Sequence, residues 1–167
     1  MNLAKLFITV ALCAMPYLAN SIAACINTID GKVIGIVDGD TIDVLQNKVT
    51  YRIRLADIDA PEKGQPYGNV AKKVMSALVF GKQVQVQWQS QDRNKRYLGT
   101  VFCAGTDVCL AMIQKGYAWK YYAANNAAYA SAMAKAKSAR LGLWAAPKPI
   151  DPHDWRRLSK AERDRYR

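Results

Sequence analysis

Apolar and polar positions alternate along the first third of the chain in a pattern that predicts short strands. β-Branched runs over residues 32–37 and 41–45 are separated by Asp38-Gly39-Asp40, and Asp-Gly is a dipeptide typical of hairpin turns. After a second polar turn, residues 49–55 alternate again, with apolar side chains on one face and arginines on the other. The pattern predicts a three-stranded meander.

The next part of the chain switches between helical and strand periods. Apolar residues recur at helical spacing after Asn69, alternate over residues 83–89, and form another strand pattern over residues 97–103. Two further helices follow, one capped by Asp107 and an alanine-rich one over residues 127–140. This order predicts an α+β protein that is mainly β: a five-stranded OB-type barrel with about three helices.

The first 24 residues have the layout of a secretory signal peptide. One positive charge, Lys5, precedes a short apolar run over residues 6–15 and then small residues. The run is too short to span a membrane as a helix. We therefore divide the chain into a signal peptide (1–24), one domain (25–146) and a basic tail (147–167) that we expect to be flexible. The signal peptide predicts export to the periplasm or the medium.

Three cysteines remain after the expected cleavage, and they leave two questions open. Cys103 and Cys109 flank a turn that contains Gly105, and they could form a disulfide in an oxidising compartment. Cys25 is then left over, and the sequence Ile22-Ala23-Ala24-Cys25 is similar to a bacterial lipobox. Cys25 is thus either the lipidated first residue of an outer-membrane lipoprotein or a free or differently paired thiol.

The charge of the chain indicates a polyanionic partner. Without the first 24 residues, 23 Lys and Arg stand against 13 Asp and Glu, a net charge of +10. On a small exported domain this charge favours nucleic acid first, and an anionic membrane or cell-wall polymer second. Charge alone does not separate these partners.

Clustered carboxylates stand out against this basic background. Asp38 and Asp40 lie at the first hairpin turn, and Asp59 and Glu62 follow the strand that carries Arg54. Each of them alone is ordinary for a turn or a solvated loop. Together, oxygen ligands from two turns beside an arginine suit a hard cation such as Ca²⁺ that faces an anionic substrate.

The single histidine narrows the chemistry further. It is His153, in the tail, so a Ser-His-Asp or Cys-His system inside the domain is excluded, and any general base is a carboxylate, a lysine or a tyrosine. Arg54 and Arg96 are the candidates for holding a phosphate. Paired guanidiniums bind phosphate oxygens and stabilise the extra charge of a five-coordinate transition state.

Four short motifs occur in order along the chain: Asp38-Gly39-Asp40-Thr41, Arg54-Leu55-x-x-x-Asp59-x-Pro61-Glu62, Tyr67-Gly68-x-x-Ala71 and Asp92-x-x-x-Arg96. Taken together they resemble the thermonuclease (staphylococcal nuclease-like) family, and the resemblance covers roughly residues 32–144. It implies an OB-fold phosphodiesterase that depends on Ca²⁺, acts on DNA and RNA, and leaves 3′-phosphates.

The resemblance also implies a metal site. Asp40 and Asp59 match the direct Ca²⁺ ligands of the family, and the backbone carbonyl of Ala60 matches a third ligand. Asp38 matches an outer carboxylate that acts through water.

The catalytic groups are implied in the same way. Glu62 matches the carboxylate assigned as general base, and Arg54 and Arg96 match the two phosphate-binding arginines. Tyr121 or Tyr122 matches a tyrosine that stacks on a nucleotide, which would tolerate any base.

Two departures from the family pattern affect the substrate side. Asn94-Lys95 stands before Arg96, where the family usually has an aromatic residue and then glycine. The loop over residues 63–66 is short, so a long lysine-rich substrate loop is absent from the sequence.

We therefore expect an exported, monomeric, Ca²⁺-dependent nuclease with little sequence preference, bound to a membrane only if Cys25 is lipidated. Two alternatives are a catalytically inactive nucleic-acid-binding OB module and a surface lipoprotein that uses its charge on anionic polymers. Neither explains why Arg54, Glu62 and Arg96 occur together.

Overall fold

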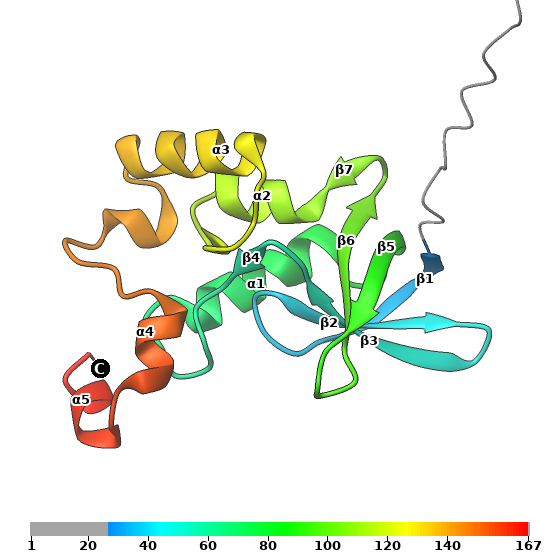
Figure 1. Cartoon of the computed structure of the whole chain (residues 1–167), viewed down its shortest axis with the longest axis horizontal. Helices are drawn as coiled ribbons and strands as arrows, with labels where there is room; N and C mark the ends of the chain where they lie inside the picture. The colour runs from blue at the N-terminus through cyan, green and yellow to red at the C-terminus, as the bar shows by residue number, and fades with distance from the viewer. Residues whose placement is uncertain (1–26, 167) are drawn as a thin grey trace, which may run out of the picture.

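A computed structural model of the chain describes residues 27–166 (Figure 1). The strands are β1 (Asn27–Ile36), β2 (Thr41–Gln46), β3 (Val49–Leu55), β4 (Ile58–Asp59), β5 (Gln83–Gln91), β6 (Tyr97–Cys103), β7 (Thr106–Asp107) and β8 (Trp119–Lys120). The helices are α1 (Gly68–Val79), α2 (Val108–Gln114), α3 (Ala127–Ser138), α4 (Pro152–Arg157) and α5 (Lys160–Asp164), with a 3₁₀ turn at Gly142–Ala145.

Five of these strands close into a barrel. The sheet runs β3-β2-β1-β5-β6-β7, and β3 also pairs in parallel with β6, so the first five strands of this order form a closed ring. Inward-facing aliphatic side chains such as Val33, Ile42 and Ile53 are fully buried. The prediction of a five-stranded, mainly β OB-type barrel is confirmed, with five α-helices in the described residues instead of about three.

The alternation of β3 decides where its arginines lie. Ile53 and Leu55 are fully buried in the barrel, so Arg54 between them points to the other face. Arg54 pairs across the sheet with Thr41, directly after the turn at residues 38–40. The amide of Leu55 donates to the carbonyl of Asp40 at 2.8 Å. The first turn and the end of β3 are therefore held together.

Gly39 allows the first turn to approach the segment that follows β4. A Cβ atom at Gly39 would lie 2.7 Å from the Cβ of Ala60 and 2.9 Å from the Cβ of Ala71. Real side chains do not approach this closely, so only glycine permits this packing. The turn that carries Asp38 and Asp40 thus lies against the segment that carries Asp59 to Glu62.

Helices cover one end of the barrel. Helices α2 and α3 pack against each other and appear together at the top of Figure 1. Asp107 caps α2 by accepting from the amide of Leu110, and Asn126 caps α3 by accepting from the amide of Tyr129. Met112 and Ile113 of α2 are fully buried in the core that these helices share with the barrel.

The C-terminal segment differs from the flexible tail that its charge predicted. It forms α4 and α5, drawn in orange and red in Figure 1. Asp151 caps α4, and Ser159 forms a capping box at the start of α5. Trp155 is 3% exposed, with the ring of Tyr166 at its edge and the guanidinium of Arg163 over its face. One buried aromatic residue and two caps outweigh the charge repulsion on which the prediction rested.

The predicted Cys103–Cys109 disulfide is not formed, since both are free, buried thiols. Cys103 ends β6, whereas Cys109 lies in α2 with its thiol against the backbone of Val101 and the hydroxyl of Tyr129. Burial raises the pKa of the Cys109 thiol to about 12. The predicted signal peptide and Cys25 lie outside the described residues. Among the residues described, no helix is long and apolar enough to cross a membrane.

Candidate active site

One cavity collects most of the residues that the motifs singled out. Its volume is about 580 Å³, and it opens beside the ends of β3 and β4. Among the residues that line it are Asp38, Asp40, Arg54, Glu62, Arg96, Tyr121 and Arg156. Four arginines and five carboxylates therefore line one hollow of a size that suits part of a nucleotide chain.

Arg54 lies at the centre of the polar network around this cavity. Its Nε is 3.1 Å from Oδ1 of Asp40, and its Nη2 is 2.9 Å from Oδ1 of Asp59. Its Nη1 donates to the carbonyls of Leu55 and Ile58 at 2.5 and 2.9 Å. The side chain is only 15% exposed. Arg54 thus joins the two carboxylates that the sequence assigned to a metal and is fixed in one orientation.

The two turns that carry these carboxylates are bonded to each other. Oδ2 of Asp40 accepts from the amide of Ala60 at 2.7 Å, although 20 residues separate them. Oδ1 of Asp38 accepts from the amide of Asp40 at 3.0 Å and shapes the turn. Asp40 therefore contacts the backbone of Ala60, next to Asp59, and Asp38 contacts the backbone of Asp40. The metal-binding roles that the resemblance implies for these residues stay a prediction.

Burial sets the electrostatics of the two inner carboxylates, because Asp40 is 5% exposed and Asp59 is 4% exposed. Burial raises the pKa of Asp40 to about 7, and the like charges of Asp38 and Asp59 add to it, against the opposing effect of Arg54. Burial raises the pKa of Asp59 as well, although Arg54 and Arg156 oppose it. Additional positive charge nearby would therefore stabilise the ionised form of both carboxylates.

This donor set fits a calcium ion. It offers carboxylate and carbonyl oxygens on two turns, the ligand type that Ca²⁺ prefers, and burial leaves the carboxylates short of positive charge. Within residues 27–166, no group of three or more His, Cys, Asp and Glu side chains forms a ready-made cage for a metal. A cation here would therefore need backbone carbonyls, water or substrate oxygens to complete its coordination.

Arg96 reaches the cavity from the turn before β6. Its guanidinium is 2.8 Å from Oδ2 of Asp92, and Oδ1 of Asp92 accepts from the amides of Asn94 and Arg96. Asp92 thus shapes the turn and aims Arg96 at the same time. The departure from the family pattern at Asn94-Lys95 leaves Lys95 in the left-handed region, with a φ of 59°. A glycine suits such a conformation better.

The two candidate stacking tyrosines take different positions. Tyr121 lines the cavity, and its amide donates to the carbonyl of Asp57 at 2.8 Å. Tyr122 is 74% exposed. The centroid of its ring lies 4.5 Å from that of Tyr121 and 6.0 Å from that of His153. Trp119 is buried with its ring edge-on to Trp144. Of the two candidates, Tyr121 is therefore the one placed in the cavity itself.

Two site residues were missed by the sequence analysis. Arg156 lies in α4 and makes ion pairs with Asp59 and Glu62. Gln65 is buried, and its side-chain oxygen accepts from the amide of Glu62 at 2.9 Å while its nitrogen donates to the carbonyl of Ile150 at 2.8 Å. The sequence does not indicate that Arg156 contacts Glu62 or that Gln65 contacts Ile150, because each of these contacts joins the C-terminal segment to a loop more than 80 residues away.

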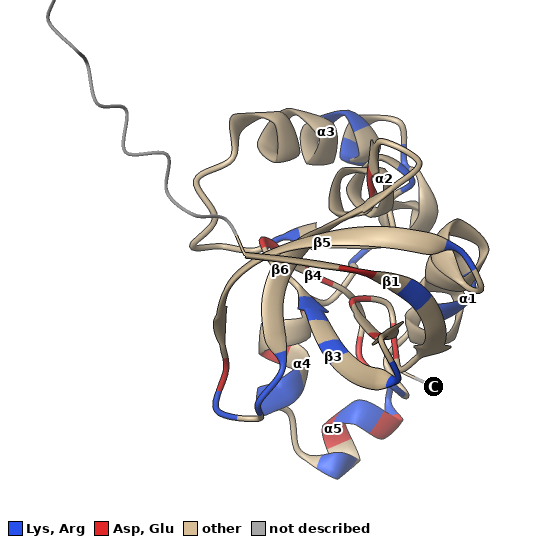
Figure 2. Cartoon of the chain, turned by 90° about the vertical axis from the view of Figure 1, so that its right-hand side faces the viewer, with Lys and Arg blue, Asp and Glu red and all other residues tan. Residues whose placement is uncertain are grey.

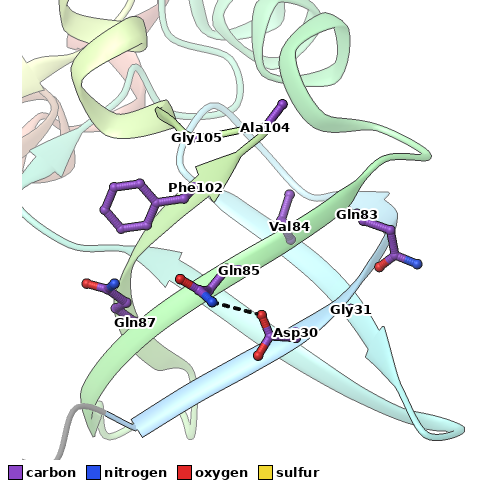
Figure 3. A pocket seen from close by; sticks show the side chains of 9 residues that line it. All are labelled: Asp30, Gly31, Gln83, Val84, Gln85, Gln87, Phe102, Ala104 and Gly105. Carbon is purple, nitrogen blue, oxygen red and sulfur yellow. Dashed lines mark hydrogen bonds between the residues drawn. The ribbon is translucent and has the colours of Figure 1, made fainter.

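A second hollow, of about 450 Å³, lies on the outer face of β1, β5 and β6 (Figure 3). Its lining contains glutamines, Phe102 and one carboxylate, Asp30, whose Oδ1 accepts from Nε2 of Gln85 at 3.2 Å. None of its lining residues is a lysine, an arginine or a histidine. Figure 2 shows the contrast, with basic residues on β3, α4 and α5 and long uncharged stretches on β5. The cavity around Arg54 is therefore the candidate for binding an anion.

Comparison with known proteins gives the class to which this fold and site belong. A family model described as "Staphylococcal nuclease homologue" matches residues 52–146. The chain is 44% identical to "Micrococcal nuclease" of Shigella flexneri over 142 residues, which cover 78% of this chain and 82% of that protein. It is 40% identical to "Protein ParB" of Escherichia coli over 80% of this chain and 82% of that protein.

A further relative is "Uncharacterized endonuclease" of Haemophilus influenzae, 38% identical over 77% of this chain and 74% of that protein. The matched segment contains the second half of β3, with Arg54, and most of the cavity lining. The chain belongs to the staphylococcal nuclease family.

Proposed function

We propose that this protein is a Ca²⁺-dependent nuclease that hydrolyses phosphodiester bonds of DNA and RNA with little sequence preference. The observation that carries the proposal is the arrangement around Arg54, which contacts both Asp40 and Asp59 and lines a cavity together with Asp40, Glu62 and Arg96. The names of relatives in Shigella flexneri and Haemophilus influenzae, a micrococcal nuclease and an endonuclease, support the same reaction class.

Asp40 and Asp59 would hold the calcium ion, with the Ala60 carbonyl as a backbone ligand and Asp38 acting through water. When bound, the ion supplies positive charge to a phosphate oxygen and to the water that attacks. The carboxylates that would hold it come from segments bonded to each other through Ala60 and Arg54, which places Asp40 and Asp59 side by side.

Glu62 is proposed as the general base, because its carboxylate lines the cavity and its side chain is 36% exposed, within reach of water. Arg54 and Arg96 would bind the non-bridging oxygens of the phosphate and stabilise the charge that develops on them. Glu62 would take a proton from water as the water oxygen bonds to phosphorus. The bond from phosphorus to the 5′ oxygen breaks, and this oxygen takes up a proton from solvent, so the products are a 3′-phosphate and a 5′-hydroxyl. Tyr121 would stack on a base.

The direct test is digestion of plasmid DNA and of RNA by the mature protein, with Ca²⁺ or with chelator. The proposal expects both polymers to be cut only with the cation, and Asp40→Ala to lose most of the activity while keeping its circular dichroism spectrum. Binding without cleavage under all conditions would identify the inactive binding module. Cleavage by Asp40→Ala at the wild-type rate would remove the metal assignment.

We also propose that the protein is exported and monomeric. The sequence supports export through residues 1–24, and Cys25 decides between a soluble enzyme and a lipoprotein. The intact mass of the mature protein tests this proposal. A diacylglycerol increment on an N-terminal Cys25 indicates membrane anchoring, an unmodified mature chain indicates a soluble enzyme, and retention of residues 1–24 refutes export by cleavage.

A further inference from the structure

Arg156 touches the two carboxylates that matter most to the proposed reaction. Its Nη2 is 2.6 Å from Oδ2 of Asp59, and its Nη1 is 2.5 Å from Oε1 of Glu62 and 3.4 Å from Oδ1 of Asp59. The two nitrogens of one guanidinium therefore hold a proposed metal ligand and the proposed base at once. More than 90 residues separate Arg156 from either partner.

Burial and hydrogen bonds hold the segment that carries Arg156 in place. Trp155, the preceding residue, is 3% exposed, and the carbonyls of Trp155 and Arg156 both accept from the guanidinium of Arg163. Before α4, the carbonyl of Ile150 accepts from Gln65, whose side chain also bonds to the amide of Glu62. The Glu62 loop is thus tied to the C-terminal segment twice, once through its backbone and once through its carboxylate.

We propose that Arg156 is a positioning residue of the active site, which holds the carboxylates of Glu62 and Asp59 in fixed relation to each other. The inference rests on the proposed function, because it takes Glu62 as the base. The side chain of Glu62 is 36% exposed, and among residues 27–166 its carboxylate has no hydrogen-bond partner other than Arg156. Removing the guanidinium would leave the base free to adopt other rotamers.

Holding two carboxylates at once requires the two separate nitrogens of a guanidinium. The guanidinium is planar and reaches two carboxylates with separate nitrogens, whereas the ammonium of lysine is a single point charge. Lysine at this position could hold Glu62 or Asp59 but not both in the same geometry. The proposal therefore expects Arg156→Lys to recover only part of what Arg156→Ala loses.

The alternative is that Arg156 acts as a plug that must leave before calcium binds Asp59. The firm mounting of α4 argues against a removable group, since Trp155 and Pro152 are buried and Arg163 is bonded to the helix end. The two possibilities predict opposite effects of removing Arg156 on the rate of cleavage. A plug slows the enzyme, so its removal raises the rate and tightens calcium binding. Loss of a positioning residue lowers the rate.

The experiment compares wild type, Arg156→Ala and Arg156→Lys, with Arg165→Ala as a control that removes one exposed positive charge from the same segment. We expect Arg156→Ala to lower kcat at least about tenfold, because small displacements of a base are costly, and to change KM less than about threefold. In a Glu62→Gln background the same substitution should cost little more. Binding of an oligonucleotide in chelator, followed by fluorescence anisotropy, should stay within about twofold of wild type, because Arg156 acts on the carboxylates and not on the phosphate.

Three outcomes overturn the inference while the nuclease stands. One is an Arg156→Ala enzyme with the wild-type rate. Another is a faster enzyme with tighter calcium binding by calorimetry, which identifies a plug. The third is a double variant, Arg156→Ala with Glu62→Gln, whose loss of rate equals the product of the two single losses, which shows that the two residues act independently. A wild-type protein that cleaves neither polymer refutes the proposed function, and this inference with it.

Discussion

The bridging position of Arg54 makes a prediction that links stability to catalysis. Arg54 is 15% exposed, and its guanidinium contacts the buried carboxylates of Asp40 and Asp59 and two backbone carbonyls. Arg54→Ala would leave both carboxylates without this partner. Removing one member of a buried ion pair typically costs about 3–5 kcal/mol. Asp40 can take up a proton, since its pKa is already about 7, so we expect a cost near the lower end, about 3 kcal/mol.

The assay is urea unfolding in chelator, followed by tryptophan fluorescence and circular dichroism. Arg52→Ala is the matched control, because Arg52 lies on the same strand but pairs with Asp43 at the surface and is 55% exposed. Exposed pairs of this kind contribute about 0–1 kcal/mol. The Arg54 variant should therefore unfold at clearly lower urea than the Arg52 variant.

The same variants test catalysis. Arg54→Ala should lower the rate of DNA cleavage about 10²–10³-fold, the usual loss for one donor to a developing charge. Arg54→Lys should recover little of this rate, because it lacks the planar fork that reaches both carboxylates. An Arg54→Ala protein as stable as Arg52→Ala in chelator, or one that cleaves DNA within tenfold of wild type, would refute the reasoning.

Three further predictions concern other parts of the chain. Cys109, with its pKa raised to about 12, and buried Cys103 should resist iodoacetamide at pH 8 in the native state and both react in urea, and intact mass will reveal a bridge if they do not. Trp155→Ala should release the C-terminal segment, so that trypsin cuts after Arg156 or Arg157 far faster than in wild type; equal cutting rates would show that Trp155 does not hold the segment. Gly39→Ala should destabilise the protein by about 1–3 kcal/mol, because its Cβ meets Ala60 and Ala71, and an unchanged urea midpoint would contradict that close packing.

The barrel could be predicted from the sequence because its strands are local patterns. Residues 49–55 alternate strictly, and glycines and polar turns mark the ends of the strands. The closing pairing of β3 with β6 is different, because it is parallel and joins segments more than 40 residues apart. No local signal in the sequence predicts which strands form this pairing.

The main site residues could be predicted because each lies at a turn or strand end. The structure brings these residues together, since Arg54 contacts Asp40 and Asp59 and lines one cavity with Arg96, while their catalytic and metal-binding roles stay predictions. The choice between Tyr121 and Tyr122 could not be made from the sequence, since both follow the short strand β8 at the start of a turn, where no regular period tells which side chain enters the cavity.

The C-terminal segment could not be predicted from its composition. The high charge predicts a flexible tail, but the segment also contains a buried tryptophan and two helix caps, Asp151 and Ser159, among its basic residues. Trp155 is buried directly before Arg156, which contacts Glu62, and the composition does not tell where this tryptophan packs. A tryptophan beside two arginines in a polar segment is the signal that could have been followed.

The central claim is that Glu62, in the cavity organised by Arg54, drives hydrolysis of a phosphodiester. The most direct measurement is the single-turnover cleavage rate of an end-labelled oligonucleotide in Ca²⁺, for wild type and Glu62→Gln. Glutamine keeps the shape and a polar contact but accepts no proton at neutral pH. We predict cleavage by wild type and a rate at least about 10²-fold lower for Glu62→Gln, the usual contribution of a general base. Equal rates for the two proteins would contradict the account.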